Sequence, residues 1–142
     1  MKKIIFVCTG NTCRSPMAMA VLNKKLAEKN IVGWTSDSAG LACAGGKISS
    51  NSARALEKIG IILNDYQSKQ LDFDMIDSAE LLVVMTEGHK SALLLTGLPE
   101  EKIRVLGAGI SDPYGGDLAV YQNCLKKIEK GIDALIEEGV FS

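Results

Sequence analysis

The sequence is poor in the side chains that hold metal ions. It has one histidine in 142 residues, and its four cysteines include no Cys-x-x-Cys pair. A zinc site built from His89 and the cysteines would lack the usual paired spacing, so we expect no metal and no cofactor. We expect His89 to be a surface or capping residue in the first turn of a helix. A hydrolase based on a cysteine–histidine pair is therefore disfavoured.

Long apolar runs and excess basic charge are also absent. No stretch reaches the length of a membrane span, and the apolar residues 4–7 end too soon for a signal peptide. A net charge of −1, a pI near 5.8 and the lack of a basic stripe argue against nucleic acid as a partner. We expect a cytoplasmic protein without a membrane partner. Its size, and the absence of repeats or linkers, predict a single domain over residues 1–142.

Buried strands and amphipathic helices are expected to alternate along the chain. The spacing of apolar residues predicts strands at 3–7, 32–38, 80–85 and 102–106, and helices at 16–29, 49–59, 87–96 and 117–138. Such alternation predicts an α/β fold, doubly wound in three layers, with a four-stranded parallel sheet and helices on both faces. In that fold the site lies at the carboxyl ends of the strands.

The most informative segment, Cys8–Ser15, lies between the first strand and the first helix. It reads Cys-Thr-Gly-Asn-Thr-Cys-Arg-Ser and is followed by Pro16. A strand-to-helix junction gathers backbone N–H groups and the positive end of the helix dipole, so it binds anions. That field, together with Arg14, favours the thiolate of Cys8 at neutral pH. A nucleophile inside a phosphate-binding loop indicates phosphoryl transfer to sulfur. The alternative without a function is that Cys8 is an ordinary buried cysteine in a tight turn.

Each residue of this loop has an expected task. Five residues between Cys8 and Arg14 let the loop curl around one centre, where the guanidinium can hold two phosphoryl oxygens. Gly10 and Asn11 are expected to adopt backbone conformations that other residues resist. Ser15 is predicted to be the helix N-cap with Pro16 at N1, and its hydroxyl could also reach Cys8 and stabilise the leaving thiolate.

A second candidate group, Asp112, follows the last predicted strand. Because strand ends meet at one rim of a parallel sheet, we expect Cys8, Ser38, Met85 and the segment after Leu106 to converge. Alone, Asp-Pro with nearby glycines is an ordinary turn. Opposite a Cys-x5-Arg loop, however, Asp112 is predicted to be the general acid and base. The competing carboxylate, that of Asp117, is predicted to be a helix N-cap.

Four segments together resemble the low-molecular-weight protein tyrosine phosphatases over essentially the whole chain. They are Val7–Pro16, Asp37–Gly40 after the second strand, Met85-Thr86 after the third, and Asp112–Gly115. The resemblance implies that the loop cysteine attacks phosphorus, that the arginine binds its oxygens and that the Asp-Pro aspartate is the acid. By position these are Cys8, Arg14 and Asp112.

The resemblance also implies the surroundings of these residues. The phosphate-binding residues are expected to be Thr9, Gly10, Asn11, Thr12, Cys13 and Ser15, with Tyr114 at the substrate and Ser38 behind the loop. The family often carries a histidine a few residues after Gly60-Ile61, which is missing here. Its absence puts the usual hydrogen-bond network around Asn11 and Ser38 in question. Cys13 either forms a protective disulfide with Cys8 or packs under the loop, and both remain open.

The substrate depends mainly on Thr12. That position is usually aliphatic in the tyrosine phosphatases, and threonine there resembles the bacterial protein arginine phosphatases. A hydroxyl can accept a hydrogen bond from a guanidinium, and residues 41–46 contain no aromatic side chain to wall a phosphotyrosine ring. We therefore expect phosphorylated proteins as partners and phosphoarginine as the substrate, with phosphotyrosine as the alternative. An arsenate reductase or a non-catalytic module that binds phosphate or other oxyanions remains a further alternative.

Overall fold

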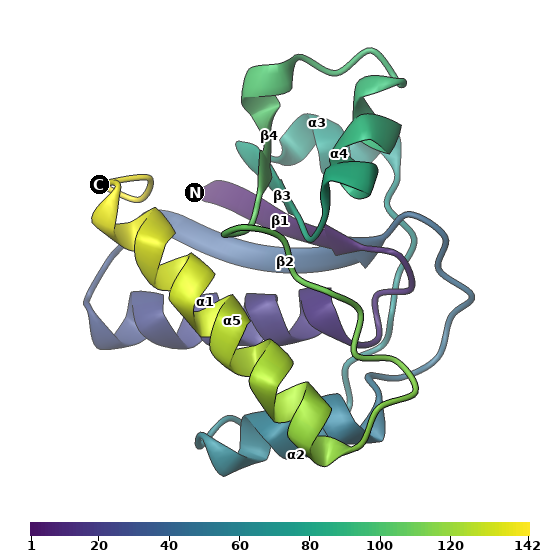
Figure 1. The fold of residues 1–142 in the computed structure, drawn as a ribbon. Helices are drawn as coiled ribbons and strands as arrows, with labels where there is room; N and C mark the ends of the chain where they lie inside the picture. Colours follow the sequence, from purple (N-terminus) through teal and green to yellow (C-terminus); the bar gives the residue numbers. More distant parts are fainter.

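The computed structural model describes all residues 1–142 and shows an α/β fold around a four-stranded parallel sheet (Figure 1). The strands are β1 (Lys2–Cys8), β2 (Trp34–Gly40), β3 (Leu81–Val84) and β4 (Ile103–Val105). The helices are α1 (Arg14–Glu28), α2 (Ser50–Lys58), α3 (Phe73–Ser78), α4 (Glu87–Leu94) and α5 (Leu118–Glu137). The predicted fold class and all four predicted strands are confirmed.

The order of the strands in the sheet is β2-β1-β3-β4, and every pair is parallel. The chain leaves β1 toward one edge and later returns to its other side with β3. A crevice forms at the carboxyl ends of strands where the direction of winding reverses, and ligands bind there in open α/β sheets. The segment after β1 lies at this point, which is why the predicted phosphate loop is well placed.

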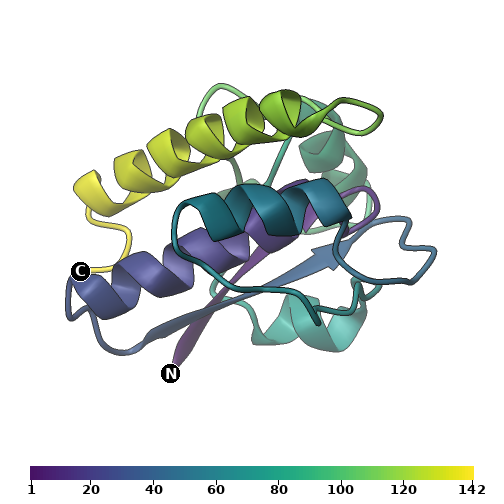
Figure 2. The ribbon, with the colours of Figure 1, turned by 90° about the horizontal axis from the view of Figure 1, so that it is seen from below.

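Helices cover both faces of the sheet: in Figure 1, α1, α2 and α5 lie below it, and α3 and α4 lie above it. Figure 2 shows α1, α2 and α5 from below, in front of the sheet. Side chains of β1 alternate between the two cores. Ile4 and Phe6 join the larger cluster with α1 and α5, and Ile5 and Val7 join the smaller one with α3 and α4. No helix combines the length and the apolar character that a membrane crossing requires.

Some predicted boundaries were wrong. The second strand begins at Trp34 because Gly33, with a φ of 89°, bends the chain before it. The strand continues to Gly40, so the motif Asp37–Gly40 is inside β2 rather than after it. Helix α3 was missed because six residues are too few for a helical period to show. Gly60, with a φ of 85°, ends the α2 segment as predicted.

Candidate active site

The loop between β1 and α1 presents a row of free backbone donors. Cys8 ends β1 with 2% of its surface exposed. The N–H groups of residues 9–14 donate no hydrogen bond to any protein group, whereas the carbonyl groups of Cys8, Thr9 and Thr12 are held by Leu41, Ala42 and Ser49 at 2.8–3.0 Å. The loop is thus fixed through its oxygens and leaves its donors free. Such a concave set of amides at a helix N-terminus binds anions.

Asn11 and Ser15 connect this loop to the sulfur atom. Asn11 has the predicted left-handed conformation, with φ 58°, and is fully buried. Its Nδ2 donates to Ser15 Oγ at 2.8 Å and to Ser38 Oγ at 3.0 Å. Ser15 Oγ lies 2.9 Å from Cys8 Sγ. The predicted contact of the Ser15 hydroxyl with the thiol is confirmed, and Ser38 lies behind the loop as expected.

Arg14 and Asp112 face each other across the site. Only 5% of the Arg14 side chain is exposed, and its Nη1 donates to the carbonyl oxygen of Ile110 at 2.9 Å. Nη2 lies 3.8 Å from Asp112 Oδ2. The Nε atom is buried without a hydrogen-bond partner in the protein. A charged donor that is buried without a hydrogen bond destabilises the folded protein, unless a bound anion accepts a hydrogen bond from it.

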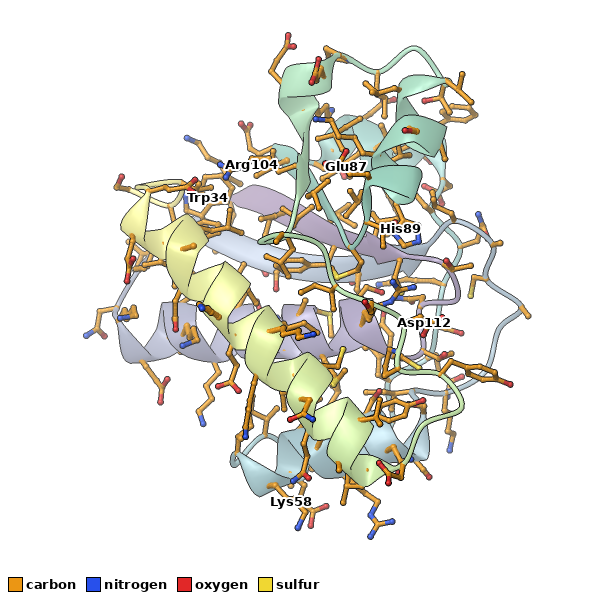
Figure 3. All side chains as sticks on the ribbon, viewed as in Figure 1. Trp34, Lys58, Glu87, His89, Arg104 and Asp112 are labelled. Carbon is orange, nitrogen blue, oxygen red and sulfur yellow. The ribbon has the colours of Figure 1, made fainter.

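These groups line a single cavity of about 230 Å³. Its walls are formed by Cys8, Thr9, Gly10, Thr12, Cys13, Arg14, Asp112 and Tyr114. Asp112 accepts a hydrogen bond from the Tyr114 backbone N–H at 3.0 Å, and Tyr114 is 82% exposed. Figure 3 shows Asp112 in the segment that links β4 to α5. Eight of the eleven residues predicted for the site therefore meet here.

Three expectations for the loop need correction. Helix α1 begins at Arg14 and its N-cap is Cys13, so Ser15 is not the cap and uses its hydroxyl on Cys8 instead. Gly10 has no positive φ, and a Cβ there would meet only Thr12 Oγ1 at 3.8 Å. The side chains of Asn11 and Ser15 do not line the cavity but are buried and support the loop, while the backbone N–H of Asn11 is among the free donors of residues 9–14.

Tyr66 completes the network that the missing histidine had put in question. Its hydroxyl lies 2.6 Å from Ser38 Oγ and donates to Asn11 Oδ1 at 2.9 Å. Burial raises the pKa of Tyr66, although its hydrogen bond to Ser38 acts in the opposite direction. A sequence signal existed, because Tyr66 follows Gly60-Ile61 by a few residues, where the family often carries its histidine.

His89 was also misjudged. It is 8% exposed rather than a surface residue, and its Nε2 lies 2.9 Å from Thr9 Oγ1 of the loop. Its Nδ1 lies 3.0 Å from Thr86 Oγ1, the N-cap of α4. Burial lowers the pKa of His89, and the nearby Arg14 lowers it further. Figure 3 places His89 on the α4 side of the site, facing the loop, so the histidine connects α4 to the phosphate loop.

The four cysteines are all free thiols. Cys13 is buried, and its Sγ lies 3.5 Å from Tyr121 Oη and 3.6 Å from Ser49 Oγ, so in this state it packs under the loop. Cys124 is buried on α5, and burial raises its thiol pKa to about 11. Cys43 lies in the loop after β2, partly exposed. Nowhere in the structure do three or more His, Cys, Asp or Glu side chains lie close enough together to hold a metal ion.

The model of the low molecular weight phosphotyrosine protein phosphatase family matches residues 3–139. The chain belongs to this family. A crystal structure of a low molecular weight protein tyrosine phosphatase from T. tengcongensis superposes with a TM-score of 0.91 at 33% identity, covering 97% of this chain and 99% of that one. A cysteine-to-serine mutant of the YwlE arginine phosphatase, with a phosphorylated active-site serine, has a TM-score of 0.90 at 30% identity, covering 96% and 94%.

Related sequences carry different activities in their names. A protein-arginine-phosphatase from Geobacillus stearothermophilus is 37% identical, over 96% of this chain and 95% of the relative. Arsenate reductase 1 from Bacillus cereus (strain ATCC 10987 / NRS 248) is 33% identical, over 97% and 96%. Membership of the family therefore leaves the substrate to be argued from the site.

Proposed function

We propose that the protein is a phosphoprotein phosphatase that forms a phosphocysteine intermediate and acts on phosphoarginine in proteins. The observation that carries this proposal is the shared cavity of Cys8, Arg14 and Asp112. Binding of phosphate alone would use the guanidinium and the amides, but it needs neither a thiol nor an acid. The presence of all three in one cavity favours catalysis over a non-catalytic module.

In the first step the Cys8 thiolate attacks phosphorus in line. The S–P bond forms while the P–N bond of phosphoarginine breaks, and Asp112 gives its proton to the departing nitrogen. Arg14 Nε and the free N–H groups of residues 9–14 hold the phosphoryl oxygens as charge builds on them. These fixed donors supply the positive charge of the site, so we expect full activity in EDTA.

In the second step water hydrolyses the phosphocysteine. Asp112, now a carboxylate, takes a proton from water, whose oxygen bonds to phosphorus as the S–P bond breaks. The sulfur leaves as a thiolate, and the Ser15 hydroxyl at 2.9 Å stabilises it. Inorganic phosphate is released and Asp112 is protonated again. The phosphorylated serine in the related YwlE mutant supports covalent transfer to this loop position.

Thr12 supports phosphoarginine as the substrate. It lines the cavity, and the contact of its Oγ1 within the protein is a long one, 3.7 Å from Cys13 Sγ. The hydroxyl is therefore available to accept a hydrogen bond from a guanidinium N–H. The 37% identical arginine phosphatase supports the same choice.

Two other substrates have some support. Tyr114 is exposed at the cavity mouth and could pack against a phosphotyrosine ring. Arsenate reduction is suggested by the 33% identical relative, but it requires further thiols to carry a disulfide away from Cys8. Cys124 is poorly suited to that step because its raised pKa, about 11, keeps it protonated at neutral pH.

Kinetics on matched substrates test the proposal. The same peptide would be offered with phosphoarginine or with phosphotyrosine, and Thr12→Ile would be compared with Thr12→Ser, which keeps the hydroxyl. We expect Thr12→Ile to lower the ratio of phosphoarginine to phosphotyrosine kcat/KM about tenfold, the worth of one hydrogen bond to a charged group. Thr12→Ser should keep the ratio within about twofold.

An unchanged ratio in Thr12→Ile would remove the basis for the arginine preference. Turnover that survives in Cys8→Ser would overturn the phosphatase mechanism as a whole. Acid quenching during turnover should trap phosphate on Cys8 of the wild-type protein. Formation of arsenite from arsenate and a thiol reductant, in place of phosphopeptide turnover, would favour the reductase.

A further inference from the structure

Tyr66, in the segment between α2 and α3, closes a ring of hydrogen bonds behind the phosphate loop. Its hydroxyl contacts Ser38 Oγ at 2.6 Å and Asn11 Oδ1 at 2.9 Å, and Asn11 Nδ2 contacts Ser38 Oγ at 3.0 Å. Ser38 and Asn11 are both fully buried. The three side chains therefore satisfy most of one another's polar atoms, with further bonds of Asn11 with Ser15 and the Lys69 N–H and of Tyr66 with the Ser38 carbonyl.

The donor inventory of these side chains assigns most of the protons in this ring. The amide of Asn11 can donate only from Nδ2, so Ser38 Oγ accepts from it. Ser38 then has one proton left, which it donates to the Tyr66 oxygen. Tyr66 has one proton and two acceptors, Asn11 Oδ1 at 2.9 Å and the Ser38 carbonyl oxygen at 3.0 Å, and we assign the proton to the shorter contact with Asn11. The Lys69 backbone N–H, 2.9 Å from the same Oδ1, confirms that this atom is the amide oxygen.

The same assignment extends to the sulfur of Cys8. The second Nδ2 proton of Asn11 goes to Ser15 Oγ at 2.8 Å, so Ser15 accepts there and keeps its own proton for another partner. That partner is either Cys8 Sγ at 2.9 Å or the Ala39 carbonyl at 3.5 Å. The shorter contact is the stronger hydrogen bond, so the hydroxyl of Ser15 donates to Cys8.

We propose that Tyr66 is a positioning residue that fixes the Asn11 amide, so that Ser15 always donates its proton to the Cys8 thiolate. This inference rests on the proposed function, since it assigns a task to a residue behind the same nucleophile. Tyr66 acts through Asn11 and Ser15 and does not touch the substrate. None of its contacts involves the walls of the cavity.

A phenol makes this arrangement insensitive to pH across the neutral range. Burial raises the pKa of Tyr66 above its usual value near 10, against the lowering effects of Ser38 and Lys69. The charged groups that face the phenol are Lys69, whose Nζ is 5.9 Å from the ring centroid, and Asp37 on β2, which forms an ion pair with Lys69. A histidine at this place would change its proton count between about pH 5 and 8.

The test compares Tyr66→Phe with Tyr66→His. The first readout is the rate of iodoacetamide alkylation of Cys8 against pH, followed on the Cys8 peptide by mass spectrometry. In Tyr66→Phe we expect the midpoint of that profile to move upward by about 0.5 to 1 pH unit and kcat to fall about three- to tenfold, with KM within twofold. In Tyr66→His we expect kcat close to wild type above pH 7 and an added loss below about pH 6.5.

Ser68→Ala is the matched control, since it removes a hydroxyl bond to the Gly46 carbonyl from the same segment without touching Asn11. Both readouts should stay at wild-type values in this variant. Wild-type alkylation and kcat in Tyr66→Phe would overturn the proposal. If Tyr66→Phe does not fold, the absence of the added acid limb in Tyr66→His overturns it. Alkylation needs no substrate, so a failure of phosphatase activity in the wild-type protein would be recognised separately.

Discussion

Arg14 carries two tasks that only a guanidinium can combine. One nitrogen is bound to the Ile110 carbonyl, while Nε stays free in a buried position. A lysine has a single nitrogen at the end of a flexible chain and cannot do both. We expect Arg14→Lys to lower kcat/KM about 10²- to 10³-fold in steady-state assays. A thermal melt close to that of the wild type would show that the loss is chemical, whereas near-normal kcat/KM would contradict the assigned role.

Asp112 should determine the alkaline side of the pH profile. The proposed first step needs a thiolate and a protonated acid together, so the mechanism predicts a bell-shaped profile whose alkaline limb belongs to the acid. Asp112→Asn keeps an oxygen for the Tyr114 N–H but cannot give a proton. We expect kcat to drop about 10²- to 10⁴-fold and the alkaline limb to disappear. An alkaline limb that persists in this variant would assign the acid to another group.

Asp117 provides the matched comparison for Asp112. Its side chain accepts from the Val120 N–H at 3.1 Å and is the N-cap of α5. Asp117→Ala should lower the free energy of unfolding by about 1 kcal/mol in urea titrations. We expect the alkaline limb of the activity profile to stay in place. Its loss would mean that Asp117 takes part in proton transfer.

Single residues differ in how much the sequence could reveal about them. Cys8 and Arg14 lie six positions apart and could be recognised together, because local spacing defines their loop. Tyr66 and His89 were harder to recognise, since each reaches the loop from a different part of the chain through one side-chain contact. Only the place of Tyr66 after Gly60-Ile61 pointed to such a contact, and histidine is intermediate in burial, so its type alone does not predict where it lies.

At the scale of elements, the end of β2 presses against the phosphate loop. A Cβ on Gly40 would lie 2.6 Å from the Thr9 carbonyl oxygen and 3.1 Å from the Asn11 backbone nitrogen. Because both neighbours are backbone, neither can rotate away. We expect Gly40→Ala to lower kcat at least tenfold by displacing the loop, and to destabilise the fold by about 1–3 kcal/mol. Activity and unfolding free energy close to wild type would show that the loop yields easily.

The strands were easier to predict than the connections. The central strands β1 and β3 contain short apolar runs covered on both faces, and such runs are visible in the sequence itself. The segment after α2 appeared only as a polar stretch, although it holds α3 and Tyr66. The N-cap Asp72 was the available signal there, since its side chain accepts from the Met75 N–H at 2.8 Å.

At the scale of the whole molecule, His89 makes stability depend on pH. Burial, followed by the effect of Arg14, lowers the pKa of His89 in the folded protein below the ordinary 6.5, while Asp112 acts in the opposite direction. The unfolded chain therefore binds more protons than the folded chain as the pH falls through 6.5. The stability due to this site is complete above that value and is lost toward the lower folded pKa.

Urea titrations at several pH values test the effect. The free energy of unfolding of the wild type should decrease from pH 7.5 to 5.5. His89→Gln, which keeps polar atoms near Thr9 and Thr86, should decrease less over the same interval. Equal slopes for the two proteins would assign the pH dependence to other groups.

The bond between Arg14 and the Ile110 carbonyl couples two parts of the site that could otherwise change separately. The Arg14 guanidinium, which we propose holds the anion, is hydrogen-bonded to the segment between β4 and α5, and Asp112, the proposed proton donor, lies two residues further along that segment. Insertions or deletions there would alter oxyanion affinity and leaving-group protonation at once. A variant of this segment that accepts a new leaving group would therefore have to keep the backbone carbonyl of residue 110 near Arg14, or provide another acceptor for the guanidinium.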